Sequence, residues 1–127
     1  MKRKSLTASE QELMKAVWEI TEEGNLASTK SIRKKLDEWR EEKTTSQVVY
    51  VQIGHLEQKG YVKIERNEND DRTYIPLVGK EEYVKQQARH WAKFWNKSAT
   101  GYAMMALGNK LTKEEKEELR SYLDELD

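Results

Sequence analysis

The stretch "TTSQVVYVQIGHLEQKGYVKIERNENDDRTYIPL", residues 44–77, changes its apolar period at Gly60. Before this glycine, Val49, Ile53 and Leu56 recur at the spacing of one helix face. Glycine is frequent just past the end of a helix. After it, apolar and polar residues alternate on both sides of a polar turn, which is typical of a β-hairpin. The stretch therefore predicts a helix followed by a two-stranded hairpin.

Two more helices are predicted upstream of this stretch. The sequence "LTASEQELMKAVWEI" contains Thr7 and Glu10 at the spacing of a capping box, and a second helix starts at Ser28. Thr44 and Gln47 have the same spacing at the start of the third helix. The buried face of the second helix is expected to consist of Ile32, Leu36 and Trp39. Three helices followed by a hairpin is the order of a winged helix-turn-helix, in which the third helix enters the DNA major groove.

The outward face of the third helix carries no charge, in a chain of which 36% is charged. Polar and small apolar side chains are suited to base edges and thymine methyl groups. The residues that we expect to contact bases are Ser46, Gln47, Tyr50 and Val51. Those that we expect to contact phosphate are Lys30, Arg33, Lys34, Lys43, Thr44, Thr45, His55 and Arg72. Lys35 and Lys59 add to the surrounding positive charge, whereas the turn of the hairpin is acidic.

The chain changes character after Pro76, which suggests a boundary between a DNA-binding domain at 1–78 and a helical region at 79–127. Apolar and aromatic residues recur at helical spacing in two segments of this second region. This stripe either packs back onto the same subunit or forms a homodimer interface, and we expect the interface. Its predicted residues are Tyr83, Trp91, Phe94, Trp95, Leu119, Tyr122, Leu123 and Leu126.

Composition excludes several function classes. The chain has 127 residues, a formal net charge of zero and no cysteine, which removes disulfides and thiol chemistry. Its two histidines, His55 and His90, have no catalytic or metal-binding partner at motif spacing, so we expect no enzyme, no metal and no cofactor. No leader or membrane span is recognisable, which predicts a cytoplasmic protein without membrane insertion. A protein-interaction adaptor built on a winged helix is the alternative from another class.

The stretches already quoted, together with "LTKEEKEELRSYLDEL" near the end of the chain, resemble the penicillinase and methicillin-resistance repressors. The resemblance extends from about Leu6 to Leu126. It implies a mainly α winged-helix repressor with a small β-hairpin and a C-terminal helical dimerisation region. It further implies binding to a palindromic operator on double-stranded DNA as a homodimer. In the antibiotic-linked members, a membrane sensor and protease pathway leads to cleavage of the repressor.

Some positions depart from the pattern of that family. The family commonly has Thr where Val51 stands and Arg where His55 stands. The antibiotic-linked repressors are cut at an Asn-Phe bond, and this sequence has none; the corresponding stretch reads "AMMALGN". The cysteine cluster of the copper-responsive branch is missing as well. The resemblance therefore implies a repressor but does not carry over an inducing signal or the base contacts of its relatives.

Overall fold

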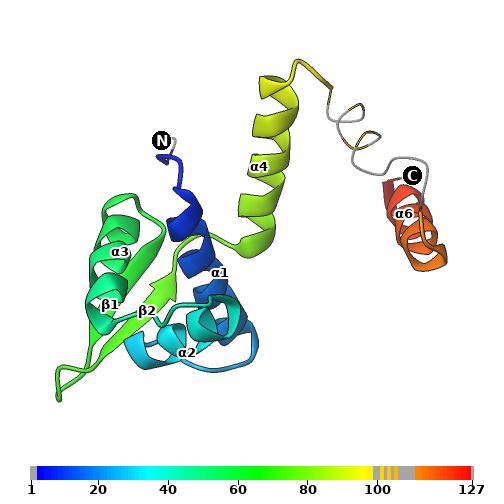
Figure 1. The fold of residues 1–127 in the computed structure, drawn as a ribbon. Coiled ribbons are helices and arrows are strands. Elements are labelled where there is room, and N and C mark those ends of the chain that lie inside the picture. The colour runs from blue at the N-terminus through cyan, green and yellow to red at the C-terminus, as the bar shows by residue number, and fades with distance from the viewer. Residues whose placement is uncertain (1–2, 99–100, 102, 104, 106–110, 127) are drawn as a thin grey trace. The chain divides into compact units, whose positions relative to one another are not determined.

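The computed structural model describes residues 3–98, 101, 103, 105 and 111–126. The chain forms two compact units, Met1–Tyr83 and Val84–Asp127. The elements are α1 (Ala8–Glu22), α2 (Thr29–Trp39), α3 (Ser46–Gln58), β1 (Val62–Arg66), β2 (Arg72–Pro76), α4 (Lys80–Phe94) and α6 (Lys113–Leu126) (Figure 1). This order confirms the mainly helical fold with a small β-hairpin that the sequence predicts.

Side-chain caps set where the first helices begin. The backbone N–H of Thr7 donates to Glu10 Oε1 over 2.8 Å, and the N–H of Glu10 donates to Thr7 Oγ1 over 3.2 Å, as the sequence predicts. At α3 the cap lies one residue later than predicted, because Thr45 Oγ1 accepts from the N–H of Val48. Thr44 is buried instead, and its backbone is held by side chains of α2.

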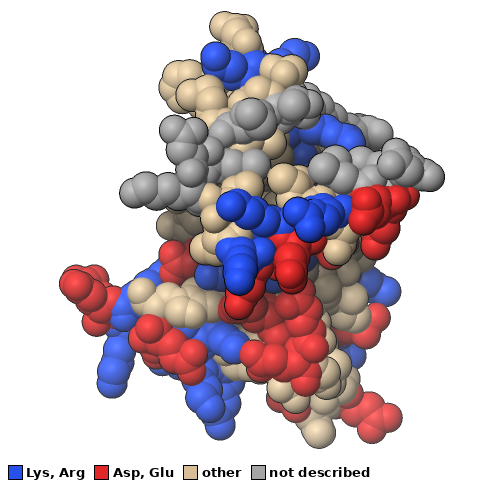
Figure 2. All heavy atoms as spheres, turned by 90° about the vertical axis from the view of Figure 1, so that its right-hand side faces the viewer, with Lys and Arg blue, Asp and Glu red and all other residues tan. Residues whose placement is uncertain are grey.

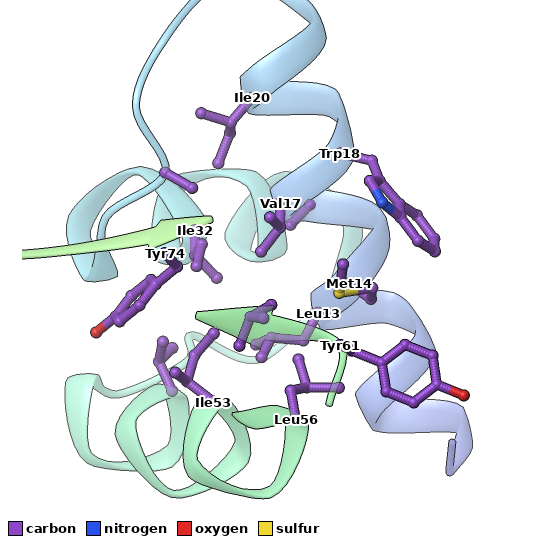
Figure 3. Packing of buried hydrophobic residues seen from close by; sticks show 14 of the residues in the cluster. Leu13, Met14, Val17, Trp18, Ile20, Ile32, Ile53, Leu56, Tyr61 and Tyr74 are labelled. Atoms are coloured by element: carbon purple, nitrogen blue, oxygen red, sulfur yellow. The ribbon is translucent and has the colours of Figure 1, made fainter. Parts of the chain in front are cut away.

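The core of the N-terminal unit lies between α1, α2, α3 and the hairpin. The inner face of α3 is fully buried, with Val49, Ile53 and Leu56 each at most 1% exposed. Figure 3 shows Ile53 and Leu56 pointing toward Leu13 of α1. This arrangement confirms the predicted inward face of the third helix.

One residue that we expected in this core lies at the surface. Trp39 is 36% exposed at the last position of α2, and the ammonium of Lys15 lies 4.6 Å from the centre of its ring. The indole therefore lies under a charged side chain of α1 at the surface rather than in the core. An aromatic residue at the end of a helix is free to leave the buried stripe, because no following turn holds it there.

The hairpin is antiparallel and is joined by a third short segment. Its register pairs Val62 with Pro76 at one end and Arg66 with Arg72 at the other. The backbone N–H of Tyr74 also donates to the carbonyl of Ala27 over 2.9 Å, so the loop before α2 adds an isolated bridge to the sheet. The sequence pattern gave no sign of this bridge, which ties the wing to the start of the helix-turn-helix.

The start of α4 packs into the N-terminal unit. Trp18 donates from Nε1 to the carbonyl of Val78 over 2.9 Å, and its ring lies 5.4 Å from that of Tyr83. Tyr83 also meets Tyr61 edge to face and is only 6% exposed. The burial of Tyr83 is therefore complete within one chain, whereas the sequence suggested that this residue faces a partner subunit.

The large aromatic residues that the structure describes in the C-terminal unit lie at the surface. Trp91, Phe94 and Trp95 are 40%, 57% and 61% exposed, and neighbouring rings meet edge to face. On α6, Leu119 and Tyr122 are exposed as well. The side chains of Leu123 and Leu126, two further residues of the predicted interface, lie outside the described part of the structure. The chain therefore presents an apolar surface on each of these two helices.

A buried carboxylate joins the first turn of α1 to the end of α3. Glu10 is 3% exposed, and its Oε1 accepts from Lys59 Nζ over 2.6 Å. Burial raises the pKa of this carboxyl group, but the bonds from Lys59 and Thr7 outweigh it and leave the pKa below its usual value. His55 Nδ1 lies 3.7 Å from the other carboxylate oxygen.

Replacing Glu10 with Ala is expected to lower the free energy of unfolding by about 1–3 kcal/mol at neutral pH, because Lys59 loses its charged acceptor. Since the pKa is lower in the folded state, the contribution of this carboxylate is fully present above its ordinary pKa of 4.5 and is lost as the pH falls through the folded value. The free energy of unfolding, measured by urea denaturation between pH 7 and 3, should fall more steeply with decreasing pH in wild type than in Glu10→Ala. The exposed Glu57→Ala is the control, and equal effects of the two changes would contradict this account.

Candidate nucleic-acid interface

Helix α3 presents its uncharged face outward. Tyr50 and Val51 are 45% and 52% exposed, and Gln47 is exposed beside them. Gln47 and Val51 line an open groove between α3 and the first turn of α1, to which His55 also contributes. A Cβ added at Gly54 would meet no atom within 4 Å, so packing within the chain does not require a glycine there. The structure thus leaves an unobstructed surface of mixed polar and small apolar groups.

A polar network fixes the turn that leads into this helix. Asp37 accepts from the backbone N–H of Thr44 over 2.8 Å, and Arg40 donates to the hydroxyl of Thr44 and to Glu12 of α1. Arg33 donates from Nε to the carbonyl of Thr44 over 3.0 Å and from Nη1 to the hydroxyl of Ser46 over 2.9 Å. Helix α3 is therefore held at its start by side chains of α2.

This network gives two of the expected phosphate contacts another role. Thr44 is 5% exposed, and both its backbone and its hydroxyl are bound within the protein. Arg33 is half-buried, and two of its N–H groups are used inside the turn. Ser46, which we expected to contact a base, accepts one of these bonds. The sequence indicated polar residues at this turn but not that they bind one another.

Other basic residues expected near DNA are exposed. Lys30 and Lys34 lie one turn apart on α2, and Lys43 lies in the loop before α3. Within the described residues none of these three forms an ion pair, whereas Lys35 is bound to Glu23 and Lys59 to Glu10, each over 2.6 Å. Thr45 is exposed at the N-cap of α3. On α2 and the loop before α3, these three lysines therefore supply exposed positive charge that no described ion pair occupies.

The wing contributes one arginine to the surface of α3. The guanidinium carbon of Arg72 lies 4.9 Å from the centre of the Tyr50 ring. The opposite arginine of the hairpin, Arg66, is turned toward Asp70 at 3.4 Å. Residue spacing predicts the hairpin but not which of its side chains reaches a helix, so this contact was not foreseen.

The charges elsewhere are mixed in sign. Figure 2 shows Lys and Arg interspersed with Asp and Glu on the face that it presents, in keeping with a formal net charge of zero. Among the described residues, no group of three or more His, Cys, Asp or Glu side chains is placed to hold a metal ion. In the same ranges no helix combines the length and apolarity needed to cross a membrane.

Solved structures share this fold at low sequence identity. The chain is similar to hsRosR-S4, solved in a complex, with a TM-score of 0.58 and 14% identity over 96% of this chain and 90% of the other. It is also similar to MepR, a transcription regulator of the Staphylococcus aureus multidrug efflux pump MepA, with a TM-score of 0.53 and 12% identity over 96% and 78% of the two chains. These likenesses show a fold shared with winged-helix regulators.

No curated protein matches the sequence. The family model of the penicillinase repressor matches residues 6–125, which is nearly the whole chain and includes both units. That match agrees with the uncharged outward face of α3 and the hairpin beside it. The chain belongs to the penicillinase repressor family and is a DNA-binding regulator of transcription, not an enzyme.

Proposed function

We propose that this protein represses transcription as a homodimer bound to a palindromic operator, with α3 of each subunit in the major groove. The observation that carries the proposal is the exposed, uncharged face of α3, held rigidly by a buried inner face and a polar network at its start. The first half of such a helix can approach base edges without bringing a negative charge to the phosphates. The alternative, an adaptor that binds only proteins, gives no reason for lysines beside that face.

Base contacts in this proposal come from the exposed residues of α3. Gln47 can bind an adenine through two hydrogen bonds, and Val51 offers a methyl group to thymine. Ser46 can still donate its hydroxyl proton while it accepts from Arg33. The open space over Gly54 suits close approach of a DNA strand. Tyr50 completes the set that we expect to read sequence.

Phosphate contacts come from the residues around that face. The exposed Lys30, Lys34 and Lys43 supply positive charge, and the exposed Thr45 hydroxyl can donate to a phosphate oxygen. His55 and Arg72 lie at the two flanks of the helix face and join this set. We leave Arg33 and Thr44 out of it because their polar groups are engaged inside the turn.

The homodimer is proposed from the exposed residues of the C-terminal unit. Trp91, Phe94 and Trp95 form a run of exposed aromatic side chains on and just after α4, and such patches are usual at interfaces. A two-fold protein also fits a two-fold DNA site.

We place this dimer in the cytoplasm. Because the sequence has neither an Asn-Phe bond nor a cysteine, the proposal assigns no inducing protease or copper signal.

The protein is expected to have twice its chain mass of 15.0 kDa in solution at micromolar concentration. Light scattering after size exclusion measures this directly. Replacing Trp91 and Trp95 together with Ser should shift the mass toward the monomer, because both indoles then no longer drive association. The same change at Lys85, an exposed residue of α4, is the control. A monomeric wild type would contradict the homodimer.

Affinity for DNA is expected to fall steeply with salt, because bound lysines displace counterions. Replacing Lys34 with Ala should weaken binding to all sequences about equally and reduce the slope of log K against log salt by roughly one unit. Lys35→Ala is the matched control, since Lys35 lies next to Lys34 in the sequence but is bound to Glu23. Fluorescence anisotropy over a salt series provides the measurement. Equal changes in slope for both variants would remove Lys34 from the proposed contacts.

Replacing Gln47 or Val51 with Ala is expected to relax the preference for one base pair by about 1–3 kcal/mol while leaving non-specific binding nearly intact. Selection of binding sites from a random DNA pool, with wild type and both variants, measures this preference. Gln58→Ala, at the last position of the same helix, is the control. If both variants recover the wild-type consensus at full strength, recognition does not depend on this face of α3.

A further inference from the structure

The contact between Arg72 and Tyr50 joins the wing to the reading face. At 4.9 Å from the ring centre, the guanidinium carbon lies within the distance of about 6 Å at which a cation is attracted to an aromatic face. Tyr50 is 45% exposed, so the core holds only part of its ring. The arginine therefore supplies a contact that the rest of the protein does not give to this side chain.

The register of the hairpin explains why this arginine points toward α3. Arg66 and Arg72 occupy directly opposed positions at the end of the sheet next to the turn. Like charges that face each other across two strands repel, so the two side chains favour separate partners. Arg66 turns to Asp70, which follows it by four residues, and Arg72 lies over Tyr50. Asp70 of the acidic turn thus binds Arg66, which therefore does not compete with Arg72 for the ring of Tyr50.

We propose that Arg72 positions the ring of Tyr50 for its base contact, so that the wing affects which sequence is read without its tip entering a groove. This inference rests on the proposed function of α3. A guanidinium stacks through its planar face and binds phosphate through its N–H edge, so Arg72 can do both at once. Fixing the ring before binding reduces the rotational freedom that Tyr50 loses in the complex, and this favours the base that fits the fixed position.

Selection from a random DNA pool tests the inference with Arg72→Lys, Tyr50→Ala and the double variant. Tyr50→Ala identifies the base pair whose preference depends on the ring. Arg72→Lys keeps the charge but lacks the planar group, so preference at that same pair should fall about two- to fivefold while the salt dependence stays at its wild-type value. The double variant should match Tyr50→Ala at that pair, because Arg72 acts there only through the ring.

Arg66→Ala is the matched control, since it removes one positive charge from the same rung of the hairpin. It should leave both the consensus and the salt dependence close to those of the wild type, because Arg66 is turned toward Asp70. The inference is overturned, while the proposed function stands, if Arg72→Lys leaves the preference at the Tyr50-dependent base pair intact. It is also overturned if Arg72→Lys weakens the preference equally at every position. A Tyr50→Ala variant with the full wild-type consensus overturns it too. A wild type that selects no consensus overturns the proposed function, and this inference with it.

Discussion

Burial of one side of α3 is the constraint on which the rest of the site depends. Val49, Ile53 and Leu56 are packed against α1 and the hairpin, and a helix with one face fixed has no freedom to turn the other. The identity of the outward residues therefore follows from the identity of the inward ones. A substitution in this inner face is expected to act on DNA recognition through the orientation of α3, even though none of the three residues reaches the surface.

Polar contacts at its two ends complete the placement of the helix. At the start, Asp37 and Arg33 bind the backbone of Thr44, so the first turn of α3 is tied to α2. Just past the end, Lys59 is bound to Glu10 in the first turn of α1. Both contacts use charged groups that are at least partly removed from water, where a broken pair costs more than at the surface. The same groups are therefore unavailable to DNA, which leaves fewer basic residues that can contact phosphate.

The sequence predicted the elements well because their patterns are local. The capping box at Thr7, the inward face of α3 and the hairpin each follow from spacing within one segment. The shift of the cap from Thr44 to Thr45 depends on bonds from α2, which no pattern in the loop reveals. The bridge at Ala27 is likewise a tertiary contact between distant segments.

The same distinction applies to the candidate site. The exposed positions of Gln47, Tyr50 and Val51 follow from helical periodicity once the buried face is known. The engagement of Arg33 within the turn and the stacking of Arg72 on Tyr50 depend on how separate elements meet. Their roles in binding, and those of the aromatic residues of the C-terminal unit, stay predictions.

Chemical protection of DNA tests most directly whether α3 occupies the major groove. Dimethyl sulfate methylates guanine N7, which lies in the major groove, and adenine N3, which lies in the minor groove. On a fragment selected by the protein, the account predicts protection of guanine N7 in two segments separated by one helical turn of about 10 base pairs or a multiple of it. Protection confined to adenine N3, or a bound complex with every guanine N7 still reactive, would contradict the account.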